Sequence, residues 1–315
     1  MRLKQCFCLA LLAVSTPLLA EHAYITSQAA NQLSVINLDS DKIVKQLSVT
    51  KGPVGIAIDN QRHEAYVTHP EDGLVTVIDT KTFEQKYVIK TGGQPFGIVV
   101  DPSAKQQVFI TDWQRNAVLV VNPETKLVVD LLSVPESPAA LVLDDKRRRL
   151  YVANRNANLL TVLDADTPRK YAEIPTGKAP YAVTLSADGQ QIYVTAIQDN
   201  TLTIIDAETY QVIDTVKTGL SPYGINVSDD NCCIYVVNQG SNNVWVYDRQ
   251  TFEKTAEIAV GKMPESLSFS TDQKQAYVTN WFSNSVSVID RKTGKKTNDI
   301  SMPSGPRSLG QFIGE

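Results

Sequence analysis

The 315-residue chain is poor in the residues that build disulfide frameworks. It has four cysteines, and Cys6 and Cys8 lie within the first twenty residues. The other pair, Cys232 and Cys233, has no third cysteine to bond with, which excludes an ordinary long-range bridge. These two could be reduced, bond to another chain or join each other. Two separately packed thiols is the interpretation that we favour, because neighbouring strand residues point to opposite faces.

Motifs for common cofactors are also absent. The sequence contains no C-x-x-C-H haem attachment, no Walker motif and no dinucleotide-binding glycine pattern. Three scattered histidines beside two adjacent cysteines disfavour a dedicated zinc or copper site, although aspartates from distant segments could still gather around a metal. We therefore predict no cofactor.

Long hydrophobic runs are lacking after the first twenty residues. Within them, Arg2 and Lys4 precede the apolar stretch 6–14, and small residues lead to Ala20. This order is typical of a secretory signal peptide, and the run is too short to span a bilayer. We predict a signal peptide over 1–20, cleavage after Ala20, and a periplasmic or secreted chain over 21–315 without a membrane span.

The chain has no excess of positive charge. Without residues 1–20 it holds 28 basic and 34 acidic residues, a net charge of −6. That balance works against sequence-independent binding of nucleic acid, which needs clustered lysine and arginine. The single short basic run, 146–149, is interpreted as a solvated hairpin tip.

What the sequence does have is a repeat that occurs seven times. Three markers recur every 42 or 43 residues: an aromatic residue at a strand start, Asn or Asp thirteen residues later, and a proline in a turn. The aromatic positions are Tyr24, Tyr66, Phe109, Tyr151, Tyr193, Tyr235 and Tyr277, and the prolines are Pro53, Pro95, Pro138, Pro180, Pro222, Pro264 and Pro306. A fixed period near 40 filled with short β-branched and aromatic runs is the signature of propeller blades.

Each repeat predicts four short strands and no helix. The unit that starts at Pro53 has apolar runs of about five residues, separated by Gly, Asp, Asn and Pro turns. Because the chain starts at an aromatic strand and ends with a proline strand, residues 306–313 should supply the innermost strand of the blade formed by 23–49. We predict one all-β domain, a seven-bladed β-propeller closed by this one-plus-three arrangement.

Three segments carry a family resemblance. Tyr-Val-Thr-Asn at 277–280, Tyr-Val-Ala-Asn at 151–154 and Tyr-Val-Val-Asn at 235–238 resemble the YVTN-repeat β-propellers. The resemblance covers the chain after residue 20 and implies a fold, not an activity. Members of the wider family include exported propellers without an assigned reaction, a group that binds single-stranded DNA, propellers found beside quinoprotein dehydrogenases, and lactonases.

Functional residues are sought where the repeats differ. Three positions at the predicted mouth of the central channel vary most: the last residue of the aromatic strand, the residue after it, and the residue after each proline. The regular tyrosines are interpreted as packing between blades, and the repeated Asn and Asp residues as turn formers. The candidate binding residues are His69, Phe96, Asp112, Trp113, Arg155, Tyr181, Tyr223, Glu265, Trp281 and Arg307.

The favoured hypothesis is a non-enzymatic, exported and monomeric propeller that binds a protein, an extended ligand or a small ligand at this mouth. A second hypothesis is a lactonase-like hydrolase or lyase using His69, Asp112, Arg155 or Glu265, which a metal-supplemented lactone assay would reveal. A third is an accessory to a quinoprotein or metal-uptake system. A fourth is single-stranded DNA binding through Trp113 and Trp281, which the net charge disfavours.

Overall fold

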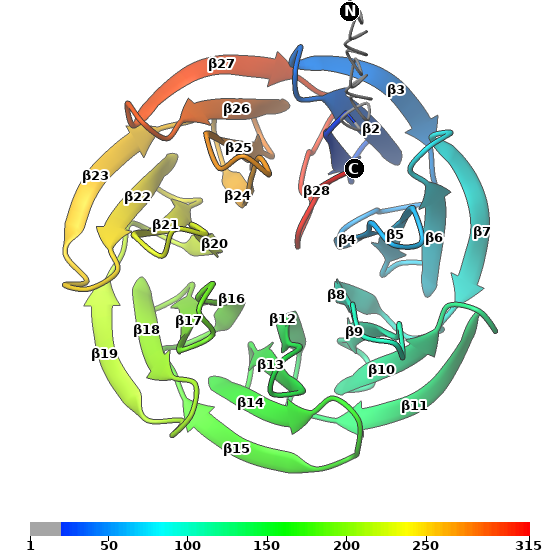
Figure 1. The fold of residues 1–315 in the computed structure, drawn as a ribbon, viewed down its shortest axis with the longest axis horizontal. Helices are drawn as coiled ribbons and strands as arrows, with labels where there is room; N and C mark the ends of the chain where they lie inside the picture. The colour runs from blue at the N-terminus through cyan, green and yellow to red at the C-terminus, as the bar shows by residue number, and fades with distance from the viewer. Residues whose placement is uncertain (1–19) are drawn as a thin grey trace, which may run out of the picture.

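The computed structural model describes residues 20–315, in which 28 strands and no helix occur. The strands form seven four-stranded antiparallel sheets arranged around a central axis (Figure 1). We count the strands of each sheet from the axis outward. In the third blade, for example, β8 is the first strand and β11, on the rim, is the last. The predicted seven-bladed propeller is confirmed.

The first four blades, in order around the ring, contain the following strands. They are β1 (His22–Ser27), β2 (Gln32–Asn37), β3 (Lys42–Ser48) and β28 (Ile313–Gly314); β4 (Ile56–Asp59), β5 (Glu64–His69), β6 (Leu74–Asp79) and β7 (Glu84–Lys90); β8 (Pro95–Val100), β9 (Val108–Asp112), β10 (Ala117–Asn122) and β11 (Leu127–Ser133); β12 (Pro138–Asp144), β13 (Arg149–Asn154), β14 (Leu159–Asp164) and β15 (Lys170–Pro175).

The last three blades follow the same order. They are β16 (Pro180–Leu185), β17 (Gln191–Ala196), β18 (Thr201–Asp206) and β19 (Val212–Lys217); β20 (Pro222–Val227), β21 (Cys233–Asn238), β22 (Asn243–Asp248) and β23 (Lys254–Ala259); β24 (Pro264–Phe269), β25 (Gln275–Asn280), β26 (Ser285–Asp290) and β27 (Lys295–Ser301).

The two ends of the described chain meet in the first blade. Strand β28 pairs with β1 through Ala23 and Ile313, and an isolated bridge joins Ser27 to Pro306. Between these points the amide of Tyr24 donates to the carbonyl of Phe312 at 2.8 Å. The expected one-plus-three closure is therefore present.

The regularly spaced tyrosines of the repeat pack the blades together. Five of the tyrosines are fully buried, and Tyr235 is 5% exposed. Apolar clusters join neighbouring blades, as where Tyr66 and Val75 pack with Ile98 and Ile110. A single sheet cannot cover both of its apolar faces, so each blade depends on its neighbours.

The threonine of the repeat ties inner strands together near the mouth. The Thr111 hydroxyl accepts a hydrogen bond from the Gly97 amide at 2.8 Å and donates to the Ala139 carbonyl of the next blade at 2.7 Å. Thr68 makes the same two bonds one blade earlier. A Cβ on Gly97 would lie 2.5 Å from the Ala139 carbonyl oxygen, so glycine is needed at this close approach.

The repeated Asn residues before the third strand are turn formers, as expected. Asn116 has φ of 50°, and its side-chain oxygen accepts from the Ser137 amide at 3.0 Å. Asn31, Asn158, Asn200, Asn242 and Asn284 accept in the same way from the residue 21 positions later. Each of these side chains therefore holds the loop that leads to the next blade.

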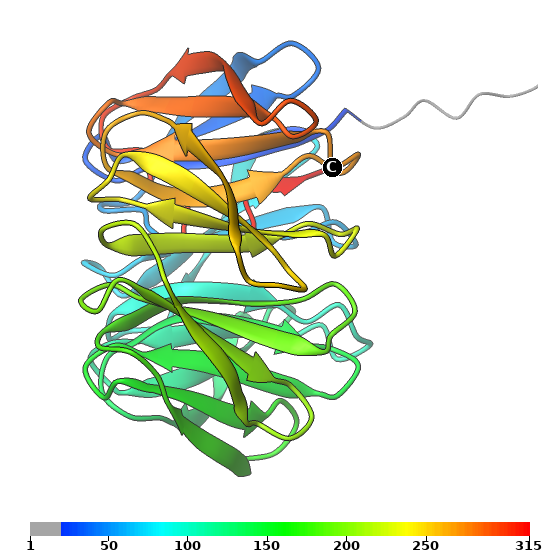
Figure 2. The same ribbon diagram turned by 90° about the vertical axis from the view of Figure 1, so that its left-hand side faces the viewer.

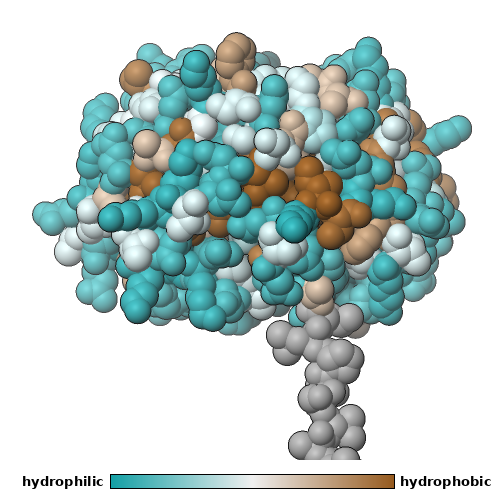
Figure 3. Space-filling view, turned by 90° about the horizontal axis from the view of Figure 1, so that it is seen from above, coloured by the Kyte–Doolittle hydropathy of each residue, from teal (hydrophilic) through white to brown (hydrophobic). Residues whose placement is uncertain are grey.

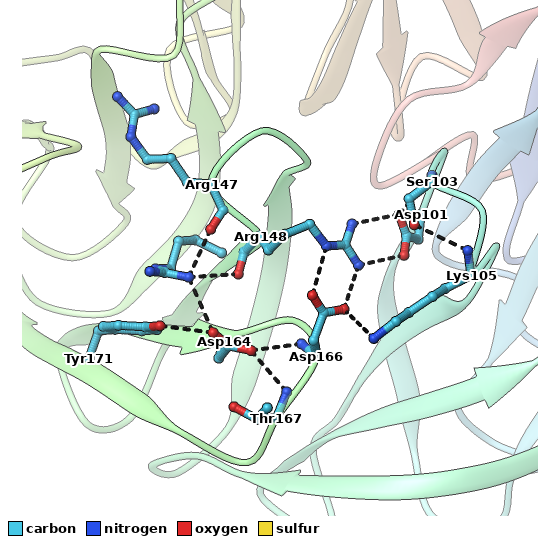
Figure 4. Close-up of polar contacts among 10 residues, drawn as sticks. Asp101, Ser103, Lys105, Arg147, Arg148, Asp164, Asp166, Thr167 and Tyr171 are labelled. Carbon is cyan, nitrogen blue, oxygen red and sulfur yellow. Dashed lines mark hydrogen bonds and ion pairs between the residues drawn. The ribbon is translucent and has the colours of Figure 1, made fainter.

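The basic run 146–149 covers the hairpin turn after β12 and the first residue of β13, but the expectation of a solvated tip is wrong for its arginines. Arg148 donates to both carboxylate oxygens of Asp101 at 2.8 and 2.7 Å and also bonds Asp166 (Figure 4). Arg149 pairs with Asp164 and lies over the ring of Tyr171. Acids on neighbouring turns bind these cations, a partnership that a single segment of sequence does not reveal.

Cys232 and Cys233 are joined by a disulfide between adjacent residues. The favoured interpretation of two separate thiols is therefore wrong. Cys232 precedes β21 and Cys233 begins it, so the pair lies in the turn region where the alternation of strand side chains has not yet begun.

The rim is mainly hydrophilic on the side that carries β27 and β3, with hydrophobic side chains in a band at mid-height (Figure 3). Among residues 20–315, no helix is long and apolar enough to cross a membrane. The predicted signal peptide, residues 1–20, lies almost wholly outside the described residues.

Candidate ligand-binding site at the channel mouth

The channel mouth is built from two concentric sets of side chains. The inner set follows the blade prolines: Val54, Phe96, Ala139, Tyr181, Tyr223, Glu265 and Arg307. The outer set follows the second strand of each blade: Gln28, Pro70, Trp113, Arg155, Ile197, Gln239 and Trp281. Both sets lie on one face, because the residue that ends the second strand pairs with the proline that begins the first, as Asn238 does with Pro222.

Arg307 connects both sets across the channel. Its guanidinium donates to the Tyr181 hydroxyl at 2.7 Å and to the Gln28 side-chain oxygen at 2.8 Å. Its Nε lies 3.0 Å from a carboxylate oxygen of Glu265. Tyr181 belongs to the fifth blade and Arg307 to the first, so this side chain spans the mouth.

Burial sets the electrostatics of this centre. Glu265 is 6% exposed, and burial raises its pKa although Arg307 and Gln239 oppose the rise. Burial also raises the pKa of Tyr181 to about 12. Burial lowers the pKa of the Arg307 guanidinium, but Tyr181 and Glu265 raise it, and its pKa lies above the usual value. Burying a charged side chain costs desolvation free energy even when the side chain is paired. This centre is therefore a candidate for function.

Aromatic rings extend the cluster over several blades. Phe96 and Trp113 stack with ring centres 4.2 Å apart, and Phe96 meets Tyr181 edge to face at 6.2 Å. Tyr181 and Tyr223 lie 4.5 Å apart. The Arg307 guanidinium lies 5.8 Å from the ring centre of Trp281, and that of Arg155 lies 6.0 Å from the ring centre of Trp113.

Eight of the ten candidates therefore form one contiguous cluster: Phe96, Trp113, Arg155, Tyr181, Tyr223, Glu265, Trp281 and Arg307. We call this set the mouth cluster. Sequence reasoning did not select Gln28 and Gln239, which bond Arg307 and Glu265. Both occupy the outer variable position of the repeat, so the variability of that position could have identified them.

His69 and Asp112 do not join the mouth cluster. His69 is fully buried, its Nδ1 lies 3.2 Å from the Lys51 carbonyl, and burial lowers its pKa. Asp112 is fully buried and accepts from the amides of Gln94 and Gln114. Each side chain therefore bonds the loop that leads into its own blade, through Lys51 for His69 and Gln94 for Asp112.

The channel beneath the mouth cluster contains a cavity of about 260 Å³. Inner strands line it with mostly apolar groups, including Ile98, Leu141, Val183, Ile225 and Leu267. No group of three or more His, Cys, Asp or Glu side chains in residues 20–315 is placed to hold a metal. Thr184, Asn226, Ser266 and Gln311 also line the cavity, whereas the charged side chains of this region lie at the mouth.

This ring of repeats makes the protein a seven-bladed β-propeller. Residues 138–233 match the family model described as YNCE-like beta-propeller, which supports the expected resemblance to YVTN-repeat propellers. The protein named "Uncharacterized protein YncE" of Escherichia coli K12 is 31% identical over 94 residues, and so is that of E. coli O157:H7. The match covers 29% of this chain and spans 27% of the length of each relative.

Solved structures share the fold. The Kuenenia stuttgartiensis hydrazine synthase superposes with a TM-score of 0.76 at 20% identity, over 85% of this chain and 91% of that one. A functionally unknown protein from Desulfotomaculum acetoxidans gives 0.78 at 14%, over 92% and 99%. The dihydro-heme d1 dehydrogenase NirN gives 0.69 at 13%, over 89% and 63%. At these identities the likeness concerns the fold alone.

Proposed function

We propose that the protein is an exported, non-enzymatic binding module whose mouth face receives a partner protein. The observation that carries this proposal is the gathering of eight divergent side chains into one cluster on a regular scaffold. Repeated residues explain the fold, so a buried Arg307–Glu265 pair at one point of the ring requires another reason. Binding energy at interfaces concentrates in such tryptophan, tyrosine and arginine side chains.

A patch of exposed apolar side chains beside the cluster supports a protein partner. Phe282 is 66% exposed, Leu220 59% and Met263 38%, and all three lie on loops of the mouth face. Phe282 and Met263 line a groove with Gln239, which reaches the cluster through Glu265. Exposed apolar side chains grouped beside an aromatic centre are typical of protein docking surfaces.

No observation favours a lactonase-like reaction or the binding of single-stranded DNA. The lactonase-like hypothesis needs His69 or Asp112 to reach a substrate, and both are engaged in buried loop contacts. Phe96 stacks on one face of Trp113, which leaves a single face of that ring for a nucleic-acid base.

Photo-crosslinking in the producing cells tests the proposal. A benzoylphenylalanine in place of Phe282 conserves the ring and should form a defined protein adduct. The control carries the same group in place of Val129, which is 52% exposed on the outer strand β11. Adducts from position 129 alone, or none from position 282, would rule out a protein partner at the mouth.

A further inference from the structure

The mouth cluster contains one arginine without a carboxylate partner. Eight arginines of residues 20–315 form ion pairs, and Arg155 and Arg169 do not. Arg169 is exposed, but Arg155 is half-buried and its Nε is shielded from solvent without a hydrogen bond. Within residues 20–315, no carboxylate balances the charge of Arg155 and its Nε has no acceptor.

Two further donors lie beside Arg155. The indole Nε1 of Trp113, whose ring Arg155 faces, is also buried without a hydrogen bond. Burial and the charge of Glu265 raise the pKa of Tyr223, while the charges of Arg307 and Arg155 oppose that rise. The Tyr223 hydroxyl makes no hydrogen bond within the described residues, so three side chains of the mouth cluster carry a donor without an acceptor.

The acceptors of the mouth cluster are already engaged. Arg307 and Gln239 bind the two carboxylate oxygens of Glu265. Glu136 lies on the loop whose Ser137 carbonyl accepts from the Arg155 amide, yet it is exposed and forms no ion pair with Arg155. The cluster therefore carries one uncompensated positive charge.

Resting on the proposed function, we propose that Arg155, Trp113 and Tyr223 bind a carboxylate on an apolar body. A carboxylate carries one negative charge and matches the single unpaired cation, whereas a phosphate monoester would bring nearly two. Arginine and carboxylate also form paired hydrogen bonds. The carboxylate belongs to an acidic residue or chain end of the partner, or to a free small acid, with its apolar part against Tyr223.

Two matched probes test the proposal in a Trp245→Phe background, where tryptophan emission reports on Trp113 and Trp281. N-acetyl-phenylalanine should bind saturably, and its neutral amide, N-acetyl-phenylalaninamide, should bind at least tenfold more weakly. Phenyl phosphate should bind more weakly than the carboxylate. Equal binding of the acid and the amide would overturn the proposal.

Variants assign the effect to Arg155. Arg155→Gln should weaken binding of the acid about tenfold or more, and Arg155→Lys should restore part of it because the charge returns. Arg169→Gln removes the same charge from an exposed site and should bind like the parent. Unchanged affinity in Arg155→Gln with an unaltered melting temperature would contradict the assignment.

Competition separates this inference from the proposed function. If N-acetyl-phenylalanine present during irradiation suppresses formation of the protein adduct from position 282, the carboxylate belongs to the partner. If the adduct forms to the same extent under irradiation with saturating probe, the carboxylate site serves a free acid. Adducts without any probe binding would contradict the carboxylate site alone, whereas probe binding without adducts would contradict the protein partner alone.

Discussion

At the scale of single residues, hydroxyl groups decide how inner strands meet. Thr26, Thr68, Thr111 and Thr279 each donate to a carbonyl 28 residues further on, in the neighbouring blade. The bond lies in the buried inner layer, where an amide without an acceptor costs more than it would in water. The threonine in Tyr-Val-Thr-Asn therefore contributes to joining blades.

Thr111→Val should lower the free energy of unfolding by about 1–3 kcal/mol, because the Gly97 amide and the Ala139 carbonyl lose their partner. Urea unfolding followed by circular dichroism measures the change. Thr203→Val is the control, since the Thr203 hydroxyl is buried without a hydrogen bond, and it should be neutral or stabilising. Equal losses in both variants would show that the bond across blades is not the cause.

Part of the mouth cluster could be predicted from single positions of the sequence. Position in the repeat identified Phe96, Tyr181 and Arg307 as neighbours, because equivalent positions of a ring face one axis. It could not distinguish them from His69, since the orientation of a strand's last residue depends on the loop that it contacts. Nor could it pair Arg307 with Tyr181, which lies 126 residues away across the mouth.

At the scale of elements, the short strand β28 closes the ring. Phe312 is fully buried among side chains of the first blade and its neighbours, and its carbonyl accepts from Tyr24. Its amide lies 3.3 Å from the Ser268 hydroxyl of the seventh blade. One residue thus links both sides of the junction.

Phe312→Ala should lower the free energy of unfolding by about 3–5 kcal/mol through the cavity that it leaves. Deletion of 306–315 should cause aggregation, because it exposes the inner edge of β1. Phe282→Ala, on an exposed loop, should change the unfolding energy by less than about 0.5 kcal/mol. A truncated chain that melts at the parent's temperature would argue against the closing role of β28.

The closure was predictable from sequence because the first and last repeat fragments are complementary. The basic turn was not, because Asp101 lies 47 residues before Arg148 in another blade. Regular spacing determines strand order, whereas ion pairs between turns depend on how two blades are rotated against each other.

At the scale of the whole molecule, charged side chains bind the turns of neighbouring blades on the face opposite the mouth. Partners about 61 residues apart recur: Arg62 with Glu124, Lys105 with Asp166, Arg147 with Glu208, Arg249 with Asp188 and Arg291 with Asp230. These pairs join five consecutive blade boundaries. Several are exposed and contribute little alone, whereas Arg148 adds a less exposed contact with two acids.

Arg148→Gln should lower the free energy of unfolding at neutral pH by about 1–3 kcal/mol. Arg148 holds the pKa of Asp166 at about 2, below its value of 3.8 in an unfolded chain. A carboxyl whose pKa is lowered by folding stabilises the protein above pH 4, and this contribution disappears as the pH falls toward 2. The variant should therefore lose less stability over that interval.

Unfolding curves measured from neutral pH to pH 2 provide the test. Arg169→Gln removes an exposed arginine without a carboxylate partner, so its curve should run parallel to that of the parent. A parallel curve for Arg148→Gln as well would mean that the pair with Asp166 does not contribute to acid sensitivity.

The meeting of β1 and β28 also fixes how the molecule can be tethered. His22 pairs with Gly314 at the end of the blade opposite Pro306, so the described chain leaves the ring on the face away from the mouth (Figure 2). A linker attached at Glu315 or before His22 would hold the propeller with its mouth facing away from the surface to which the linker is fixed. An immobilised protein would then present every copy of the mouth to solution in the same orientation.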